Sequence, residues 1–313
     1  MRIAVTGGAG FIGSTLIKEL MQSDLKISSL QIIDNLTYAG SLDNLDSILN
    51  RPNVYFHNQT ICDKSAAAEI LKDVQYIFHL AAESHVDRSI KDASPFWNTN
   101  VLGTVALLDS IKHRDDVKFL HVSTDEVYGS TALARFVEAD PLNPSSPYSA
   151  SKAASDLACL AYGNTYNINY LITRCTNNFG PNQYPEKLLP VLVKQAMRGE
   201  PLTLYGNGGN IREWIPVEVH AQYLMRLMFS ESNRDIYNIG SGFEKSNLEI
   251  AELVLSATQS DSKINFIEDR LGHDFRYAVS TEKLNSTFPR IEYDFELEIT
   301  SCIEELAHKF STE

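Results

Sequence analysis

Short apolar runs rich in β-branched residues alternate with longer stretches of helical spacing along the first half of the chain. The runs predict buried strands at 2–6, 30–33, 74–82, 117–122 and 168–173. The stretch after residue 13 has apolar residues at helical spacing. Residues 95–112 and 149–166 predict helices with little polar face, which indicates burial on more than one side. Strands that alternate with helices predict a doubly wound parallel α/β sheet.

A glycine-rich segment joins the first strand to the first helix. Gly7, Gly10 and Gly13, with a fourth glycine at position 8, fit both GxGxxG and GxxGxxG. Glycine there permits a tight turn and close approach of a pyrophosphate, which the free N–H groups of the helix N-terminus would bind. We therefore predict a Rossmann-type dinucleotide site.

The second strand ends at Asp34, about 20 residues after Gly13, where an acidic residue binds the adenosine ribose hydroxyls. Its charge would repel a 2′-phosphate, which favours NAD over NADP as the cofactor. The alternative is an aspartate in an ordinary turn at a strand end.

Beyond Gly180 the pattern becomes irregular, with turn residues and scattered cations. Residues 237–240 predict the end of a strand that returns to the main sheet. We expect an NAD-binding domain at 1–180, with a return segment at about 212–240. The remainder of 181–313 would form a smaller, discontinuous substrate domain.

Candidate chemistry follows the strand at 117–122. Thr124, Asp125 and Glu126 come directly after it, at the end of a strand where open α/β sheets bind ligands. Such a carboxylate pair is usually a solvated turn. Its position behind a dinucleotide motif and ahead of a second reactive pair favours a catalytic function.

That second pair is Tyr148 and Lys152. Ser146 and Pro147 predict the N-cap and first residue of a helix, which places Tyr148 and Lys152 on one face. A lysine ammonium beside a phenol favours the phenolate, so Tyr148 could act as a base near neutral pH. A lone YxxxK sequence is common on helices, and only the combination indicates catalysis.

Composition narrows the function further. The formal net charge of −13 argues against binding to nucleic acid. No apolar run is long enough to span a bilayer, and we expect neither a signal peptide nor a membrane partner. His79 and His85 lack a matching ligand set, so no metal is expected. The four cysteines fit no metal or redox spacing and predict free thiols in a reducing cytoplasm: Cys62, Cys159, Cys175 and Cys302.

Together these segments resemble the extended short-chain dehydrogenase/reductases, and within them the dTDP-glucose 4,6-dehydratase family. The Thr124-Asp125-Glu126 sequence separates these dehydratases from related nucleotide-sugar epimerases. The resemblance runs from Met1 to about Ala278. The segments that carry it are 7–13, Asp34, 37–40, 79–89, 123–129, Tyr148xxxLys152, 177–181, 185–190 and 270–274.

The resemblance implies three sets of site residues. The catalytic set is Thr124, Asp125, Glu126, Tyr148 and Lys152. The cofactor set is Gly7, Gly10, Phe11, Ile12, Gly13, Asp34, Thr37, Ile61, Leu80, Ala81, Ala82, Thr99, Tyr148, Lys152 and Asn178. The substrate set is Ser84, Asp87, Asn177, Lys187, Leu188, Tyr205, Arg212, Asn247, Arg270 and His273.

The implied reaction is NAD-dependent dehydration of a nucleoside-diphosphate glucose to its 4-keto-6-deoxy sugar. Two alternatives are a 4-epimerase, which would leave the carboxylate pair idle, and a silent NAD-sensing module. Departures from the family at Thr60, Thr203, Glu213, Pro216 and Ser280 leave thymidine and uridine open as the nucleoside.

A homodimer is also expected. The helices predicted at 95–112 and 149–166 are more apolar than contact with one sheet requires. Their remaining faces would be wet in a monomer, which is unusual for a patch of several hundred Å². The candidate residues are Val101, Val105, Leu108, Leu157, Leu160 and Ala161. Pairing across a two-fold axis would cover them, and the resemblance implies the same assembly.

Overall fold

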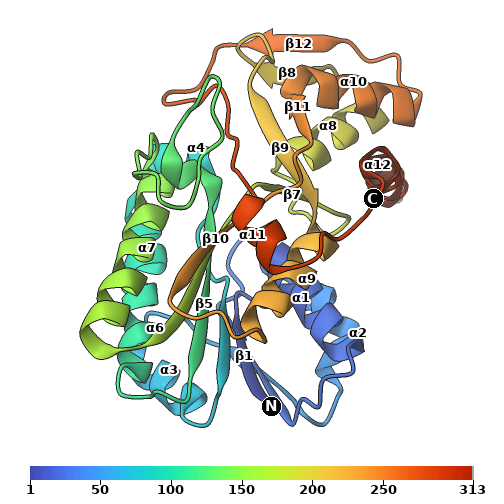
Figure 1. Ribbon diagram of the computed structural model, residues 1–313. Coiled ribbons are helices and arrows are strands. Elements are labelled where there is room, and N and C mark those ends of the chain that lie inside the picture. Colours follow the sequence, from blue (N-terminus) through green and yellow to red (C-terminus); the bar gives the residue numbers. More distant parts are fainter. Residues whose placement is uncertain (312–313) are drawn as a thin grey trace.

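The computed structural model describes residues 1–311 and contains one large parallel sheet with helices on both faces (Figure 1). The strand order is β10-β6-β5-β4-β1-β2-β3, and every neighbouring pair is parallel. The strands are β1 (Arg2–Thr6), β2 (Ser29–Asp34), β3 (Val54–Asn58), β4 (Tyr76–His79), β5 (Lys118–Thr124), β6 (Asn169–Cys175) and β10 (Asp235–Ile239). The predicted Rossmann-type fold is confirmed.

Two helical layers cover this sheet. In Figure 1, α1 (Phe11–Gln22) and α9 (Val217–Met228) lie on one face, and α3 (Lys64–Leu71), α6 (Thr104–Ile111) and α7 (Pro147–Tyr166) lie on the other. Each layer encloses its own apolar core. Shorter helical segments are η1 (Leu42–Leu45), α2 (Asp46–Leu49), α4 (Val86–Lys91) and the 3-10 turn η3 (Asp125–Tyr128).

The helix predicted at 95–112 is divided in the structure. It consists of α5 (Ser94–Phe96), a π-helical segment η2 (Trp97–Gly103) and α6. Leu108, expected on a wet face, is fully buried against the core, so that expectation was wrong. The other predicted helix has the expected start, because Ser146 caps α7 and Pro147 is its first residue.

The rest of the chain forms a smaller layered unit above the carboxyl ends of the large sheet (Figure 1). It contains a three-stranded sheet of β7 (Asn177–Phe179), β9 (Ile211–Pro216) and β11 (Glu244–Ser246), and a two-stranded sheet of β8 (Leu202–Tyr205) and β12 (Ile264–Ile267). Its helices are α8 (Leu188–Met197), α10 (Asn247–Thr258) and α12 (Phe295–Ser311), whereas the short helix α11 (Glu282–Thr287) packs against β10 of the large sheet. Trp214 and the stacked rings of Phe243 and Phe295 contribute to its core and flank.

The chain returns to the large sheet through α9 and β10. The strand expected near 237–240 is β10, which pairs with β6 along its length. Within the segment 212–240, β9 pairs instead with β7 and β11 of the smaller unit. The chain therefore passes more than once between the large sheet and the smaller unit, and the cavity of the site lies where these two units meet.

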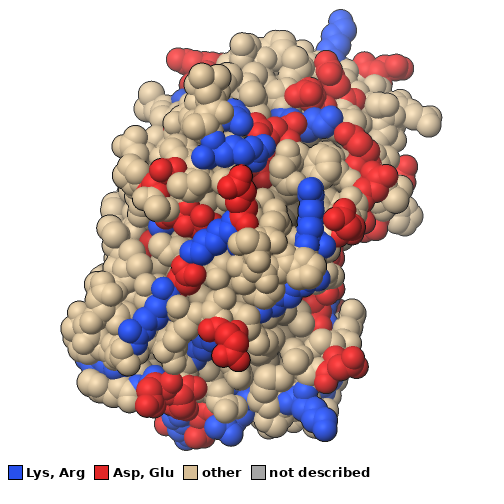
Figure 2. Space-filling view, viewed as in Figure 1, with Lys and Arg blue, Asp and Glu red and all other residues tan. Residues whose placement is uncertain are grey.

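Acidic and basic side chains are interspersed on the face shown in Figure 2. None of the helices in residues 1–311 combines the length and the apolar character needed to cross a membrane. All four cysteines are free. Across the same residues, the histidine, cysteine and carboxylate side chains form no group of three or more that could hold a metal ion.

Candidate active site

A cavity of about 320 Å³ opens at the carboxyl ends of β1, β2, β4 and β5. This is the edge at which open parallel sheets bind their ligands. All residues of the expected catalytic and cofactor sets line it, from Gly7 to Asn178. Of the expected substrate set, Ser84, Asn177 and Lys187 line it as well.

The glycine loop leaves no room for side chains. Gly7 has φ +70°, and a Cβ atom there would lie 2.6 Å from the amide nitrogen of Ala81. A Cβ on Gly13 would lie 2.1 Å from the carbonyl oxygen of Gly7. Helix α1 begins after Gly10 without a side-chain cap. The free N–H groups of its first turn border the cavity and can bind a phosphate.

Asp34 is held rigidly at the end of β2. Its Oδ2 accepts from the amide of Ala9 at 2.9 Å, and its Oδ1 accepts from the amide of Leu36 at 2.9 Å. Burial raises the pKa of Asp34, and these two hydrogen bonds oppose that rise. The carboxylate lines the cavity and retains free lone pairs for ribose hydroxyls.

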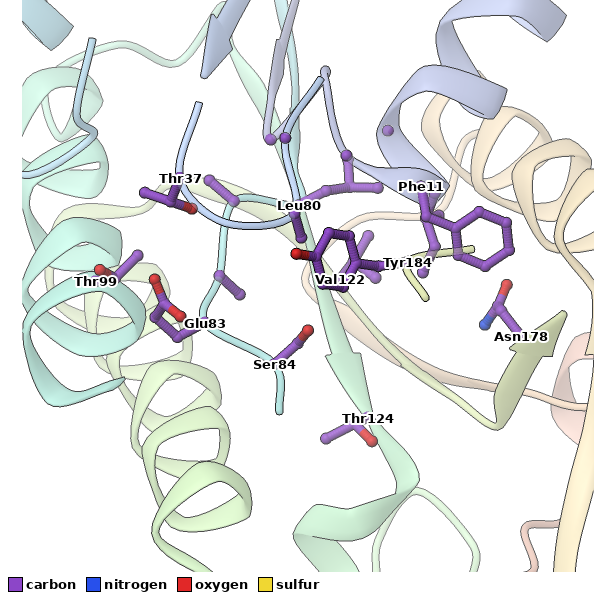
Figure 3. Close-up of a pocket in the computed structure, with 18 of the residues that line it drawn as sticks. Phe11, Thr37, Leu80, Glu83, Ser84, Thr99, Val122, Thr124, Asn178 and Tyr184 are labelled. Carbon is purple, nitrogen blue, oxygen red and sulfur yellow. The ribbon is translucent and has the colours of Figure 1, made fainter. Parts of the chain in front are cut away.

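Residues from distant segments converge on the cavity in Figure 3. Thr124 comes from the end of β5, Ser84 from the segment after β4, and Thr99 from η2. Phe11 and Asn178 come from α1 and β7 on the opposite side. The site is therefore assembled by the two faces of the large sheet and by the smaller unit together.

Tyr148 and Lys152 lie on the buried face of α7. A capping box between Ser146 and Ser149 fixes the start of this helix. The ammonium of Lys152 donates to the carbonyl oxygen of Val122 at 2.7 Å and is buried.

The surroundings of Tyr148 differ from the sequence expectation. Burial, followed by the charge of Glu126, raises the pKa of Tyr148 well above its usual range, while contact with Thr124 lowers it. Burial and the charge of Glu126 therefore oppose ionisation of the phenol. A positive charge near the phenol, as NAD⁺ would bring, favours the phenolate.

Asp125 is buried and Glu126 is half-buried near Tyr148, and the two carboxyl groups differ in charge environment. Burial raises the pKa of Asp125 well above its usual range, and the charges of Glu126 and Glu213 raise it further. Burial also raises the pKa of Glu126, but Arg270, Arg212 and Lys187 oppose the rise. The surrounding charges thus favour ionisation of Glu126 more than ionisation of Asp125.

Cations and aromatic rings surround the outer end of the site. Lys187 donates to the carbonyl oxygen of Ser84 at 2.9 Å. Arg270 Nη1 lies 3.4 Å from Asp87 Oδ1, and the phenol of Tyr205 donates to Oδ2 of the same carboxylate at 3.2 Å. Arg270 Nε is buried without a hydrogen-bond partner among residues 1–311. An unpartnered guanidinium nitrogen beside a cavity suits an anionic ligand.

The remaining predicted substrate residues lie around this end without lining the cavity itself. His273 bonds to Asp269 at 2.6 Å and packs edge-on against Tyr205. Leu188 begins α8, and Asn247 begins α10 with its side-chain oxygen buried and unpartnered within the described chain.

Arg212, a member of the expected substrate set, is held mainly by the protein itself. Its guanidinium donates to the carbonyl oxygens of Ile211, Asp274 and Phe275 and stacks on the ring of Tyr277. Most of its donors are therefore engaged with the protein. Its charge still acts on Glu126, whose pKa it lowers.

Several residues of the site were not in the three predicted sets. The phenol of Tyr277 donates to Asp274 at 2.7 Å and lies 3.5 Å from Glu126 Oε2. Tyr38 and Tyr184 stack edge to face at the mouth of the cavity, where Arg88 lies over the Tyr38 ring. These contacts join segments that are far apart in the chain, so no local spacing of residues predicts them.

Comparison with known proteins places this site in a family. A sequence model described as GDP-mannose 4,6 dehydratase matches residues 4–289, which is most of the chain. The chain belongs to this family. A relative named low-salt glycan biosynthesis protein Agl12, from Haloferax volcanii, is 46% identical over 97% of this chain and 98% of its own. The dTDP-glucose 4,6-dehydratase of an Actinoplanes species is 40% identical over 94% of each chain.

Solved structures of the family agree. The dTDP-glucose 4,6-dehydratase DesIV of Streptomyces venezuelae, solved with NAD and dTDP bound, superposes with a TM-score of 0.96. It is 40% identical and is covered to 98%, against 100% of this chain. The Thermus thermophilus UDP-glucose 4-epimerase, solved with NAD, has a TM-score of 0.89 at 28% identity over 98% of this chain and 99% of its own. The resemblance to the dTDP-glucose 4,6-dehydratases is confirmed.

Proposed function

We propose that this protein is an NAD-dependent hydro-lyase that converts dTDP-glucose to its 4-keto-6-deoxy sugar and water. The observation that carries the proposal is that Asp125 and Glu126 line the same cavity as Tyr148 and Lys152. A 4-epimerase needs a proton acceptor at the 4-hydroxyl but has no use for two further carboxyl groups. The dehydratases named above, at about 40% identity, support the same reaction.

The residues of the cavity fit NAD. The glycine loop excludes side chains, α1 offers free N–H groups, and Asp34 stands where ribose hydroxyls bind and a 2′-phosphate would be repelled. Bound NAD⁺ supplies the chemistry that the side chains lack, because it accepts a hydride from C4 and later returns it to C6.

Tyr148 accepts the proton of the 4-hydroxyl as C4 is oxidised. Lys152, charged and buried one helical turn away, favours the phenolate. Thr124 lies beside the phenol and can hydrogen-bond to the same sugar oxygen. Oxidation of C4 to a ketone makes the neighbouring C5 proton acidic, which prepares the elimination.

The carboxyl pair completes the dehydration. Glu126, whose ionised form is favoured by the charges of Arg270, Arg212 and Lys187, removes the C5 proton. Asp125, kept protonated by burial and by its anionic neighbours, donates its proton to the leaving 6-hydroxyl. Opposite roles for adjacent carboxyl groups thus follow from their different surroundings.

The outer end of the site holds the nucleoside diphosphate. Lys187 and Arg270 provide the charge, and the buried Nε of Arg270 is free to donate. Tyr205 and His273 provide ring surfaces nearby. In this division of the chain, residues 1–180 with a return segment near 212–240 bind NAD, and the rest of 181–313 binds the nucleotide sugar.

Two copies of the chain pair through η2, α6 and α7. Leu102 is 58% exposed and Leu157 is 56% exposed, and both lie on these helices. Val101, Val105 and Leu160 are partly buried there, and Ala161 is exposed. We place the enzyme in the cytoplasm, where a reducing environment keeps its four thiols free.

Incubation with dTDP-glucose and, separately, UDP-glucose tests the proposal. We expect a 4-keto-6-deoxy product, seen by its alkaline absorbance, from dTDP-glucose. If the same product forms only from UDP-glucose, the nucleoside of the substrate is uridine and not thymidine. Formation of the 4-epimer without loss of water would replace dehydration with epimerisation.

A further inference from the structure

A buried carboxylate that the mechanism leaves unused lies one helical turn beyond Lys152. Asp156 is fully buried on α7, and its Oδ2 accepts from Arg174 Nε at 2.9 Å. Its Oδ1 lies 3.5 Å from His121 Nε2 and has no hydrogen-bond partner among the described residues. Because residues four apart share a helix face, Asp156 is on the same side of α7 as Lys152 and Tyr148.

Asp156 is the anion that acts on Lys152. Burial lowers the pKa of Lys152, and the negative charge of Asp156 is the first of the effects that oppose this. The titratable groups that face this pair are Tyr148 and Cys159 from α7, His79 from β4, His121 from β5, and Arg174 and Cys175 from β6.

None of these neighbours can replace the carboxylate. Burial lowers the pKa of His79 to about 3, and it lowers the pKa of His121 well below its usual range, so both imidazoles are neutral. Burial raises the pKa of the Cys175 thiol to about 12, and the Cys159 thiol shifts in the same direction. Without Asp156, Lys152 would be a buried cation near a second cation, Arg174.

We propose that Asp156 is a positioning residue whose charge favours the ammonium form of Lys152 through space, while the carbonyl oxygen of Val122 fixes the place of that ammonium. Arg174 in turn fixes the carboxylate through its hydrogen bond and the further bonds of its guanidinium to Tyr128 and the carbonyl oxygen of Glu138. This inference rests on the proposed use of Tyr148 as the proton acceptor. It adds a third member to the buried row Tyr148, Lys152 and Asp156.

The effect has a definite signature in pH dependence. Tyr148 and Lys152 share a proton between two forms, phenolate with ammonium or phenol with amine. Loss of the nearby negative charge destabilises the ammonium most, so the pair releases its first proton at lower pH. The same loss moves the shared proton from Lys152 to Tyr148, so less of the pair is in the reactive form.

The test compares Asp156→Asn with wild type in single-turnover formation of NADH from dTDP-glucose across pH. We expect the plateau rate to fall roughly 10- to 100-fold and the acidic half-maximum to move down by about one pH unit. Asp156→Glu, which retains the charge, should restore the wild-type half-maximum. Asp116→Asn is the matched control, because it removes a carboxylate bonded to an arginine at the surface.

A lower plateau with an unmoved half-maximum would make Asp156 merely structural and overturn the proposal. The half-maximum is read over the pH range in which the circular dichroism of the variant is constant, so that a change in folded fraction does not obscure it. If Asp156→Asn does not fold, the double variant Asp156→Leu with Arg174→Met serves the same test. It replaces both buried ions by apolar groups, which proteins tolerate far better than one unpaired ion.

Failure of the proposed function is a separate result. Wild-type protein that turns over neither nucleotide sugar would reject the dehydratase proposal. NMR titration of ¹³C-labelled lysine side chains in the NAD-bound protein needs no turnover and then decides the role of Asp156. A Lys152 resonance that titrates at the same pH with and without the Asp156 carboxylate would overturn the inference.

Discussion

The phenol of Tyr277 lies 3.5 Å from Oε2 of Glu126 and donates to Oδ2 of Asp274 at 2.7 Å. This contact ties the tip of the large sheet to a segment about 150 residues later in the chain. Arg270, four residues before Asp274, also acts on Glu126. The segment that would recognise the nucleotide therefore also adjusts the charge of the proposed base.

Glu126→Gln should separate the two halves of the reaction. The amide keeps the shape of the side chain but cannot remove the C5 proton. We expect NADH to form and accumulate in single turnover, with elimination slowed roughly 10²- to 10⁴-fold. Exchange of C5 hydrogen with deuterated solvent should be lost to the same extent.

Tyr148→Phe is the matched comparison. It removes the acceptor of the 4-hydroxyl proton, so neither NADH nor product should form. Intact dehydration by Glu126→Gln would show that another group is the base.

Asp125→Asn should raise stability while it lowers activity. The folded-state pKa of Asp125 is raised, mainly by burial. Such a group stabilises the fold at low pH and loses this contribution as pH rises toward the folded pKa, at up to about 1.4 kcal/mol per pH unit above about pH 4. The neutral amide carries no such penalty. In thermal melts, the melting temperature of the variant relative to that of the wild type should rise from pH 4 to pH 7. The same pH dependence of the melting temperature in both proteins would contradict a raised pKa of Asp125.

Much of this arrangement could be predicted from local sequence, and the parts that could not be predicted have physical causes. Strand ends and helix caps are local, so the positions of Thr124, Asp34 and the start of α7 were predictable. β3 was not, because an edge strand such as Val54–Asn58 leaves Tyr55 half exposed and lacks a continuous apolar run. The strand predicted at 74–82 is longer than β4, because β4 ends at His79 and the residues that follow line the cavity.

Long-range effects account for the other differences. Arg212 carries a charge suited to phosphate, but only the fold shows that Tyr277 and three carbonyl oxygens engage it. Burial is likewise a property of the folded chain, so the raised pKa of Tyr148 could not be read from its distance to Lys152 along the helix. Leu108 was expected to be wet because the packing of α6 against α3 was unknown.

Arg270→Ala should weaken binding of the nucleotide sugar. Arg270 is charged, its Nε has no partner among residues 1–311, and it stands at the outer end of the site. Loss of a hydrogen bond to a charged group costs about 1.5–3 kcal/mol, so we expect KM to rise roughly 10- to 100-fold. Arg270→Lys should recover only part of this, since an ammonium cannot make the bidentate contact.

Arg51→Ala, at an exposed turn far along the chain from this end, serves as the control. It should leave KM at the wild-type value. An unchanged KM for Arg270→Ala would remove Arg270 from the proposed substrate set.

The cofactor should remain bound during purification and should be NAD. A hydride that returns to the same substrate gives no reason for cofactor release, and Asp34 opposes a 2′-phosphate. We expect NAD to co-elute with the protein in gel filtration and NADP to bind far more weakly. Asp34→Asn should reduce the difference in affinity between NAD and NADP, measured by calorimetric titration. Thr60, one of the departures from the family, lines the cavity and is the feature that could weaken retention of NAD. A need for millimolar NAD would contradict this prediction.

The proposed dimer can be disrupted at one exposed leucine. Leu157 is 56% exposed on α7, on the helix that also carries Tyr148 and Lys152. A carboxylate at its place would be buried against the partner, at a cost of several kcal/mol if unpaired. We therefore expect Leu157→Glu to shift the mass in light scattering from twice 35.0 kDa toward 35.0 kDa at micromolar protein. Leu297→Glu, at a leucine 66% exposed on α12, should leave the mass unchanged. A wild-type protein that is monomeric and fully active would refute both the assembly and its link to the catalytic helix.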